Sequence, residues 1–193
     1  PDIFSVLKKN AEVYGNGQIH VFEFGVSDKN SDASFTYFPN TPALSTLHPE
    51  QWENAPSAFS KAVKGTMKNP PEGMGWMRLI PSIFSGIIAY FLVRGRKRVD
   101  CKLVPLSEVI KNENIEQIDL LKIDCEGAEW AVLQGINDED WMKIKSLVIE
   151  VHDIDSRLES VMELLKNKGF TKLYKESEVG LEDTGMFNIF ALR

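Results

Sequence analysis

The sequence predicts an α/β fold with a mostly parallel sheet. Two short apolar strands, at residues 120–123 and 147–151, are each followed by a segment whose apolar residues recur at helical spacing. The first strand ends on Asp124 and the second on His152 and Asp153. Strands that alternate with helices form parallel sheets through right-handed crossovers, and their carboxyl ends line the ligand crevice. We therefore expect these polar strand ends to meet at a functional site.

The elements before residue 105 follow from periodicity and turn residues. We expect a helix at residues 2–14, a glycine-containing turn at 15–17, a strand at 19–26, an edge strand at 34–38 and a strand at 98–104. The pattern changes between Pro39 and Lys97, a segment with seven of the nine prolines and no sustained period of two. Long loops in compact domains are more often functional than not, so residues 39–97 are expected to form a lid over the crevice.

The second half of the chain continues to alternate helices and strands. We expect helices at residues 105–111, 128–133, 138–144 and 156–168, and strands at 120–123, 147–151, 170–176 and 186–192. With 193 residues and 43% hydrophobic content, the chain can bury a single core. One domain is therefore the economical prediction.

Charge and cysteine content exclude several classes of protein. The net charge of -6 argues against a nucleic-acid partner, because phosphate binding needs concentrated Lys and Arg. A small-molecule ligand is easier to accommodate. Cys101 and Cys125 lie in apolar strand-like segments and show neither metal-ligand spacing nor a disulfide pattern. These observations favour a cytoplasmic protein.

An apolar run at residues 79–93 is flanked by Arg78 and by the basic sequence RGRKR. A membrane span needs about 20 apolar residues, and this run is shorter and contains Pro81 and Gly86. We expect a lid helix that presents one apolar face to the crevice. That face comprises Trp76, Ile80, Phe84, Ile87, Ile88 and Phe91. The alternative is an amphipathic helix on an anionic membrane surface.

Several motifs together resemble one enzyme family. The sequence LKIDCEGAE, the later VLQG, and E-x-H at the end of the next strand resemble the FkbM family of S-adenosylmethionine-dependent O-methyltransferases. PDIFSVLKKNAEVYG, FEFGVSD and VDCKLVPLSEVI resemble further family segments. PNTPALSTLHPE resembles the segment that members within polyketide synthases place beside the acceptor. The resemblance covers most of the chain outside residues 41–98.

The resemblance implies a class I methyltransferase fold, with a Rossmann-like sheet, a C-terminal antiparallel hairpin and a helical lid. It places Pro1 just after the second strand of that fold. The first strands and the glycine-rich loop for the cofactor are therefore expected to be missing, and residues 1–193 to be the C-terminal portion of one methyltransferase domain. We expect this portion alone to bind S-adenosylmethionine poorly and to be inactive. Residues 39–97 become a lid or acceptor-binding insertion.

The polar strand ends supply the expected catalytic residues. Methyl transfer to a hydroxyl requires that the acceptor oxygen be positioned and deprotonated. His152 is the expected base, because the ordinary pKa of histidine is about 6.5. Glu150 lies two residues earlier on the same strand face and is expected to orient the imidazole or hold the acceptor. The alternative for His152 is a surface histidine that opens a loop.

The resemblance places Asp124 near the methionine group of the cofactor and near the acceptor. Glu126 follows in the same turn and is the fourth expected catalytic residue. Glu129 fits a residue that caps the following helix as well as it fits a functional one. The resemblance also places Gly25, Val26 and Ser27 along the adenine, although glycine and serine are ordinary turn residues as well.

We expect the site to work without a metal ion. The alternative is a divalent cation held by Asp124, Glu150 and His152, which would acidify the acceptor hydroxyl. Oxygen-rich sites favour such ions, but no tight ligand spacing in the sequence supports one.

Three functions follow in decreasing order of support. The first is an S-adenosylmethionine-dependent O-methyltransferase that acts on a hydroxyl of a polyketide, a sugar or a related secondary metabolite, either as a small molecule or bound to a carrier. The second is a non-catalytic methyltransferase-like interaction module. Asp124, Glu150 and His152 favour the first, because a site without function would lose such groups. A dinucleotide oxidoreductase is a distant third, since the chain has no G-x-G-x-x-G.

Overall fold

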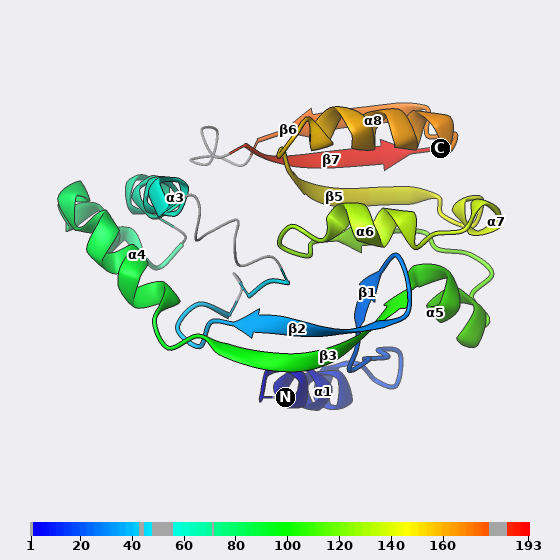
Figure 1. Ribbon diagram of the computed structural model, residues 1–193, viewed down its shortest axis with the longest axis horizontal. Helices are drawn as coiled ribbons and strands as arrows, with labels where there is room; N and C mark the ends of the chain where they lie inside the picture. The colour runs from blue at the N-terminus through cyan, green and yellow to red at the C-terminus, as the bar shows by residue number, and fades with distance from the viewer. Residues whose placement is uncertain (1, 43–44, 48–55, 71, 178–184) are drawn as a thin grey trace.

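The computed structural model describes residues 2–42, 45–47, 56–70, 72–177 and 185–193, and its strands form two sheets (Figure 1). The first sheet has the order β1-β3-β2, with β1 at Gly25–Ser27, β2 at Ser31–Tyr37 and β3 at Lys97–Pro105. The second has the order β4-β5-β7-β6, with β4 at Leu121–Ile123, β5 at Ser146–His152, β6 at Lys172–Glu176 and β7 at Met186–Leu192.

The strand directions differ from the expected mostly parallel sheet. Strand β1 pairs with β3, and β4 with β5, in parallel, over three residues each. The longer pairings are antiparallel, because β2 folds back along β3 and β7 runs back along the whole of β5. The expected C-terminal hairpin is confirmed, since β6 and β7 pair antiparallel. Among the described strands, antiparallel pairing therefore dominates.

The helices agree closely with the sequence pattern. They are α1 at Asp2–Tyr14, α3 at Pro56–Lys68, α4 at Ser85–Val93, α5 at Leu106–Asn112, α6 at Glu129–Gln134, α7 at Asp138–Trp141 and α8 at Arg157–Asn167, with short 3-10 helices η2 at Gly75–Leu79 and η3 at Ser82–Phe84. The strand expected at 19–26 shrinks to the three residues of β1, which pair with β3. The expected edge strand is confirmed, because β2 ends its sheet.

The main hydrophobic core lies between the second sheet and helices α6 and α8. On β5, alternate residues Leu147, Ile149 and Val151 are at most 1% exposed and face this core. The strand has period two, so Glu150 and His152 lie on its opposite face and are largely but not fully buried. The shared face of these two residues, expected from the sequence, is confirmed.

Helix α6 connects the two sheets through Gly135, at its carboxyl end. The Gly135 carbonyl accepts a hydrogen bond from Ser107 N at 3.1 Å, and Ser107 Oγ accepts one from Asn137 N at 2.8 Å. A Cβ atom on Gly135 would lie 2.0 Å from the carbonyl oxygen of Ser27 in β1. The close approach of α6 to β1 therefore depends on the absence of a side chain at this position.

The insertion between β2 and β3 is helical, as expected, and has its own small core. Val63 and Met67 of α3 pack on Ala89 of α4, and the hydroxyls of Ser60 and Ser85 lie 3.2 Å apart. Small residues at this contact let the two helices approach each other. In Figure 1 the pair lies to one side of the two sheets. The lid function of the insertion remains a prediction.

The apolar face expected on the insertion is not a single face. Ile80 and Ile88 pack against the small core that α3 and α4 share. The other four expected members, Trp76, Phe84, Ile87 and Phe91, are between 45% and 59% exposed. Helix α4 is apolar on all sides, so periodicity alone does not identify the side that packs on α3.

Candidate active site

The turn between β4 and α6 brings acidic side chains together. Strand β4 ends at the buried Ile123, and Asp124 follows with a side chain that is 41% exposed. Glu126 and Gly127 both have left-handed backbone conformations, with φ of 48° and 98°. Glycine adopts such angles easily, whereas for a non-glycine residue they cost on the order of 1 kcal/mol. This sharp reversal places Glu126 beside Asp124 before α6 begins.

Glu129 stabilises this turn through hydrogen bonds to its backbone. Its side chain is 3% exposed, and Oε1 accepts hydrogen bonds from Gly127 N at 2.7 Å and Cys125 N at 3.3 Å. Burial by itself would raise the pKa of this carboxyl, but the nearby His152 imidazole and the hydrogen bond from Gly127 N lower it on balance. The sequence does not distinguish Glu129 from an ordinary capping residue. The structure makes it a buried anion that supports both the turn and the imidazole.

His152 lies between two of these carboxylates. Its Nε2 is 3.8 Å from Glu126 Oε2, and its Nδ1 is 3.8 Å from Glu129 Oε2. Burial would lower the pKa of the imidazole, but the nearby Glu129 carboxylate and the charges of Glu126 and Glu150 raise it overall. Only 10% of the side chain is exposed, so the alternative of a surface histidine does not fit.

Glu126 is the carboxyl most perturbed by its surroundings. Burial, together with the charges of Glu150, Asp124 and Glu129, raises its pKa to about 7, and His152 opposes the shift. Its Oε2 atom is buried and has no hydrogen-bond partner within the described part of the chain. Glu126 and His152 interact closely enough to titrate as a coupled pair.

Three carboxylates at the strand ends lie close enough to hold a cation. One oxygen atom from each of Asp124, Glu126 and Glu150 lies within 4.8 Å of the other two. Oxygen ligands of this kind suit Mg²⁺ or Ca²⁺. The alternative drawn from the sequence combined His152 with Asp124 and Glu150, and the structure groups Glu126 with the two acids instead. The expectation of a metal-independent site remains a prediction.

A cavity of about 450 Å³ connects the two predicted groups of site residues. Gly25 and Val26 of β1 line it from one side, and Asp124 and Glu126 from the other. Its remaining lining residues are Phe35, Ser45, Leu47, Cys101, Leu103, Cys125 and Ala128. The third predicted cofactor residue, Ser27, is buried and donates a hydrogen bond to Asp28 instead of lining the cavity.

The two cysteines of the cavity wall are not joined in a disulfide. Burial raises the pKa of the Cys125 thiol to about 11, so this thiol is neutral at physiological pH. A thiolate is the nucleophilic form of cysteine. The wall at Cys125 is therefore an apolar surface, and the titrating groups of the site are Glu126 and His152.

The first residues of the insertion contact the acidic turn between β4 and α6. Thr46 is fully buried, and its hydroxyl donates a hydrogen bond to the carbonyl oxygen of Glu126 at 2.6 Å. Thr46 also forms an antiparallel bridge with Thr36 of β2. Sequence reasoning missed this residue as a part of the site. The signal was present in the segment PALSTL, whose resemblance had pointed to the acceptor side.

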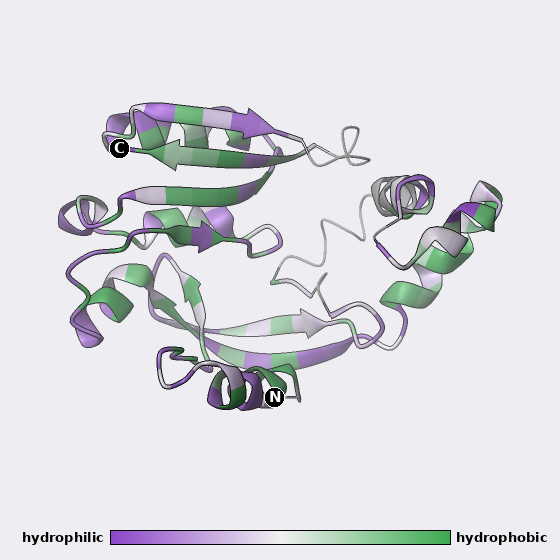
Figure 2. Ribbon diagram, turned by 180° about the vertical axis from the view of Figure 1, so that it is seen from behind, coloured by the Kyte–Doolittle hydropathy of each residue, from purple (hydrophilic) through white to green (hydrophobic). Residues whose placement is uncertain are grey.

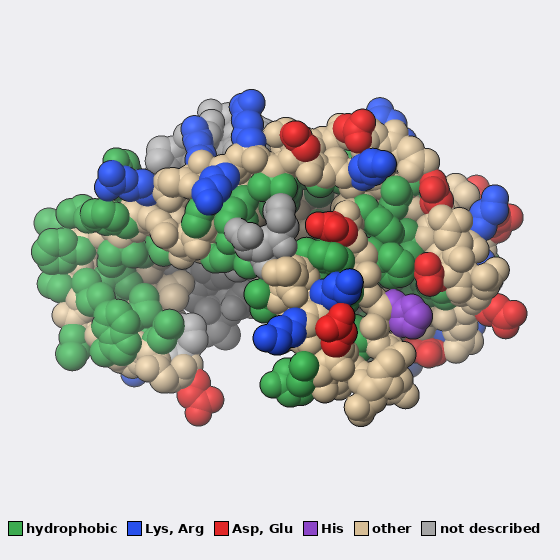
Figure 3. All heavy atoms as spheres, turned by 90° about the horizontal axis from the view of Figure 1, so that it is seen from below, with side chains coloured by type: hydrophobic (Ala, Val, Ile, Leu, Met, Phe, Trp, Pro, Cys, Tyr) green, Lys and Arg blue, Asp and Glu red, His purple; other side chains and the backbone are tan. Residues whose placement is uncertain are grey.

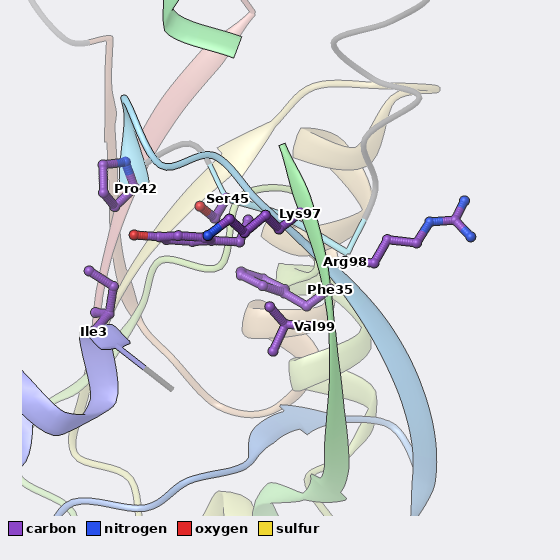
Figure 4. Close-up of a pocket in the computed structure, with 8 residues that line it drawn as sticks. Ile3, Phe35, Pro42, Ser45, Lys97, Arg98 and Val99 are labelled. Atoms are coloured by element: carbon purple, nitrogen blue, oxygen red, sulfur yellow. The ribbon is translucent and has the colours of Figure 1, made fainter. Parts of the chain in front are cut away.

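A second cavity, of about 350 Å³, adjoins the first through Phe35 and Ser45, which line both. Its other lining residues are Ile3, Tyr37, Pro42, Lys97, Arg98 and Val99. In Figure 4 the side chains of Ile3, Pro42 and Lys97 gather around the cavity, whereas that of Arg98 points away. The two cavities together offer room for two ligands on either side of Phe35.

Comparison with known proteins places these features in a family. A model of the FkbM methyltransferase domain matches residues 11–172. The 31-O-demethyl-FK506 methyltransferase FkbM of Streptomyces tacrolimicus is 31% identical over 89% of the chain. The AMB antimetabolite synthetase AmbE of Pseudomonas aeruginosa is 30% identical over 91%, and the methyltransferase sdnD of Sordaria araneosa is 28% identical over 88%. No solved structure matches the chain significantly.

The chain is shorter than these relatives. It spans 60% of the Streptomyces protein, 61% of the Sordaria protein and 8% of the Pseudomonas synthetase. The family match includes Gly25, Val26, the turn at Asp124 and the end of β5 at His152.

Proposed function

Since the chain belongs to the FkbM methyltransferase family, we propose that it carries the acceptor and proton-transfer side of an S-adenosylmethionine-dependent O-methyltransferase. The observation that supports this most is the cavity shared by Gly25, Val26, Asp124 and Glu126, with His152 directly against Glu126. The name of the Streptomyces relative describes methylation at an oxygen position, which favours a hydroxyl acceptor here.

The cavity suits the proposed donor. S-adenosylmethionine supplies a methyl group on a positively charged sulfur. The apolar wall of the cavity complements a nucleoside, and the cluster of Asp124, Glu126 and Glu150 creates a negative potential that attracts a cation. The residues present therefore fit this group. Gly25 brings the backbone of β1 to the cavity wall without a side chain.

The acceptor hydroxyl would lose its proton to Glu126, which lines the cavity, and through Glu126 to His152 behind it. Glu129, held by two backbone N–H groups, supports the Nδ1 side of the imidazole, and Glu126 lies at the Nε2 side. As the acceptor oxygen forms its bond to the methyl carbon, its proton passes to the pair formed by His152 and Glu126. Loss of this proton would leave the methylated oxygen neutral, and the electrons of the broken carbon–sulfur bond would neutralise the sulfur of the donor.

The second cavity is proposed to receive the body of the acceptor. It lies on the far side of Phe35 from the acidic turn, and Ser45 of the insertion borders both spaces. Its apolar residues and the Lys97 ammonium suit a polyketide, a sugar derivative or a related secondary metabolite, free or attached to a carrier. The competing proposal is a non-catalytic methyltransferase-like module.

Methyl transfer from labelled S-adenosylmethionine tests the proposal directly. The longest reading frame that contains the chain should label hydroxylated metabolites and leave matched deoxy analogues unlabelled. We expect donor binding in the micromolar range, about -8 kcal/mol, by calorimetry. Activity should survive EDTA, whereas loss with EDTA and recovery with Mg²⁺ would assign the three carboxylates to a cation. Absence of both donor binding and labelling would favour the non-catalytic module.

Substitution of Glu126 by glutamine should shift the pH dependence of the reaction. A base must be neutral to act, so activity falls as the pH drops through the pKa of His152. Anionic Glu126 raises that pKa, and the neutral amide does not. The acidic limb of kcat/KM in Glu126→Gln should therefore move to lower pH. Glu139→Gln, at an exposed position in α7, is the matched control. If the acidic limb of the pH profile stays in place in Glu126→Gln, Glu126 does not act together with His152.

A further inference from the structure

The helical insertion exposes an unusual number of large apolar side chains. We define the insertion patch as Trp76, Leu79, Ile83, Phe84, Ile87, Tyr90 and Phe91, which are each between 45% and 84% exposed. They come from η2, η3 and α4, which follow one another directly in the chain. Figure 3 shows hydrophobic side chains gathered at the end of the molecule where the insertion lies. Scattered exposed apolar residues are normal, but a contiguous patch marks an interaction site.

The patch is the side of the insertion that faces away from its own core. Helix α4 turns Ser85, Ile88, Ala89 and Leu92 toward α3, at the spacing of one helical face. Figure 2 shows that α4 is hydrophobic along most of its length. The side of α4 that points away from α3 is therefore also mainly apolar. Exposure of this side to water is unfavourable, so contact with an apolar environment would stabilise it.

The insertion has a net charge opposite to that of the chain as a whole. Residues 56–98 contain eight Lys and Arg residues and one acidic residue, a net charge of +7, whereas the whole chain carries -6. Arg78, Arg94, Lys97 and Arg98 are exposed and lie next to the patch in sequence. Figure 3 shows Lys and Arg side chains along the border of the hydrophobic area. The molecule is thus strongly polarised, with its positive end at the patch.

We propose that the insertion patch docks on an anionic membrane surface. Apolar side chains, among them Trp76 and Tyr90, would enter the interface while the flanking arginines and lysines contact lipid phosphates. Aromatic residues with a polar edge favour this depth of the bilayer. A basic segment next to an apolar surface is attracted by anionic lipids, and the acidic remainder of the chain orients the protein away from them. None of the described helices is long and apolar enough to cross a membrane.

An anionic lipid surface explains the apolar patch and its basic border better than a second protein does. A protein partner would need complementary acidic side chains around an apolar centre, but a phosphatidylserine surface supplies both properties on a flat plane. The exposed side chains of η3 and α4 extend outward from the small core and do not line either cavity. The proposal therefore adds a second surface to the molecule and does not depend on the methyltransferase reaction.

Vesicle sedimentation tests the proposal with the chain as it exists. Binding is expected to vesicles of phosphatidylcholine with phosphatidylserine, to be weak on phosphatidylcholine alone, and to fall with added salt. The double variant Leu79→Ser with Ile83→Ser should lower partitioning by at least about tenfold. These side chains are 84% and 82% exposed, so the fold does not depend on them.

Matched controls separate the patch from general surface effects. Val13→Ser with Leu120→Ser removes two exposed apolar side chains elsewhere, 58% and 60% exposed, and should leave binding unchanged. Arg78→Gln with Arg94→Gln should lower binding about fivefold for each charge, whereas Lys166→Gln with Lys172→Gln should not. Binding that is equal on both vesicle types, or unaffected by the patch variants, overturns the proposal. A dimer in light scattering that the Leu79 and Ile83 changes dissolve would also overturn it and assign the patch to a protein contact.

Discussion

Replacement of His152 by alanine should lower turnover by roughly 10²- to 10⁴-fold, the range expected for loss of a general base. The imidazole lies against Glu126 at the cavity and is supported on its Nδ1 side by Glu129, so it can take up the proton that Glu126 receives from the acceptor. Donor affinity should change little, because His152 does not line the cavity shared by Gly25 and Glu126.

His20 provides the matched control for this experiment. Its side chain is 68% exposed and lies 3.9 Å from Glu113, outside both cavities. His20→Ala should therefore retain normal turnover. Single-turnover rates and calorimetric donor binding, measured on all three proteins, separate chemistry from binding. Near-normal turnover of His152→Ala would mean that another group takes the proton.

Substitution of Gly135 by alanine should give the largest loss of stability of any change considered. The added Cβ would lie 2.0 Å from Ser27 O, 3.1 Å from Ser27 C and 3.3 Å from Leu106 N, all of them backbone atoms. Backbone cannot rotate away as a flexible side chain does, so α6 or β1 must move. Overpacking of this kind costs roughly 1–3 kcal/mol or more. The shift would also displace Val26 relative to the acidic turn.

Gly86→Ala in α4 is the corresponding control. A Cβ atom added at Gly86 would meet no atom of the described residues within 4 Å, and alanine favours a helix interior. This variant should keep or slightly raise the midpoint of thermal or urea unfolding, by the equivalent of about 0.5–1 kcal/mol. If Gly135→Ala unfolds at the same midpoint as the parent chain, the contact between α6 and β1 is looser than the structure indicates.

The elements with strong periodicity could be predicted from the sequence. The alternation in β5 identified Glu150 and His152 as neighbours on one face, because successive side chains of a strand point to opposite sides. Helix α1 and the hairpin of β6 and β7 were found for similar reasons. These are properties of neighbours along the chain, and residue patterns report them directly.

Other features depend on contacts between segments far apart in the sequence. The antiparallel return of β2 along β3 and of β7 along β5 arises from strand pairing, which apolar strand patterns do not specify. The packed side of α4 is set by Ser60 and Val63 of α3, since α4 itself is apolar all round. Thr46 reaches Glu126 across 80 positions of the chain.

By itself, the sequence determined the family of the protein, most of its helices and strands, and the acidic and imidazole groups at the strand ends. Each of its motifs consists of neighbouring residues that form one turn or one strand end, so the sequence alone identifies it. Only the tertiary structure decided that Glu129 is a buried anion beside His152, that Glu126 titrates near neutral pH and that Ser27 lies outside the cavity. Burial and charge proximity set these properties, and both depend on which segments the fold brings together.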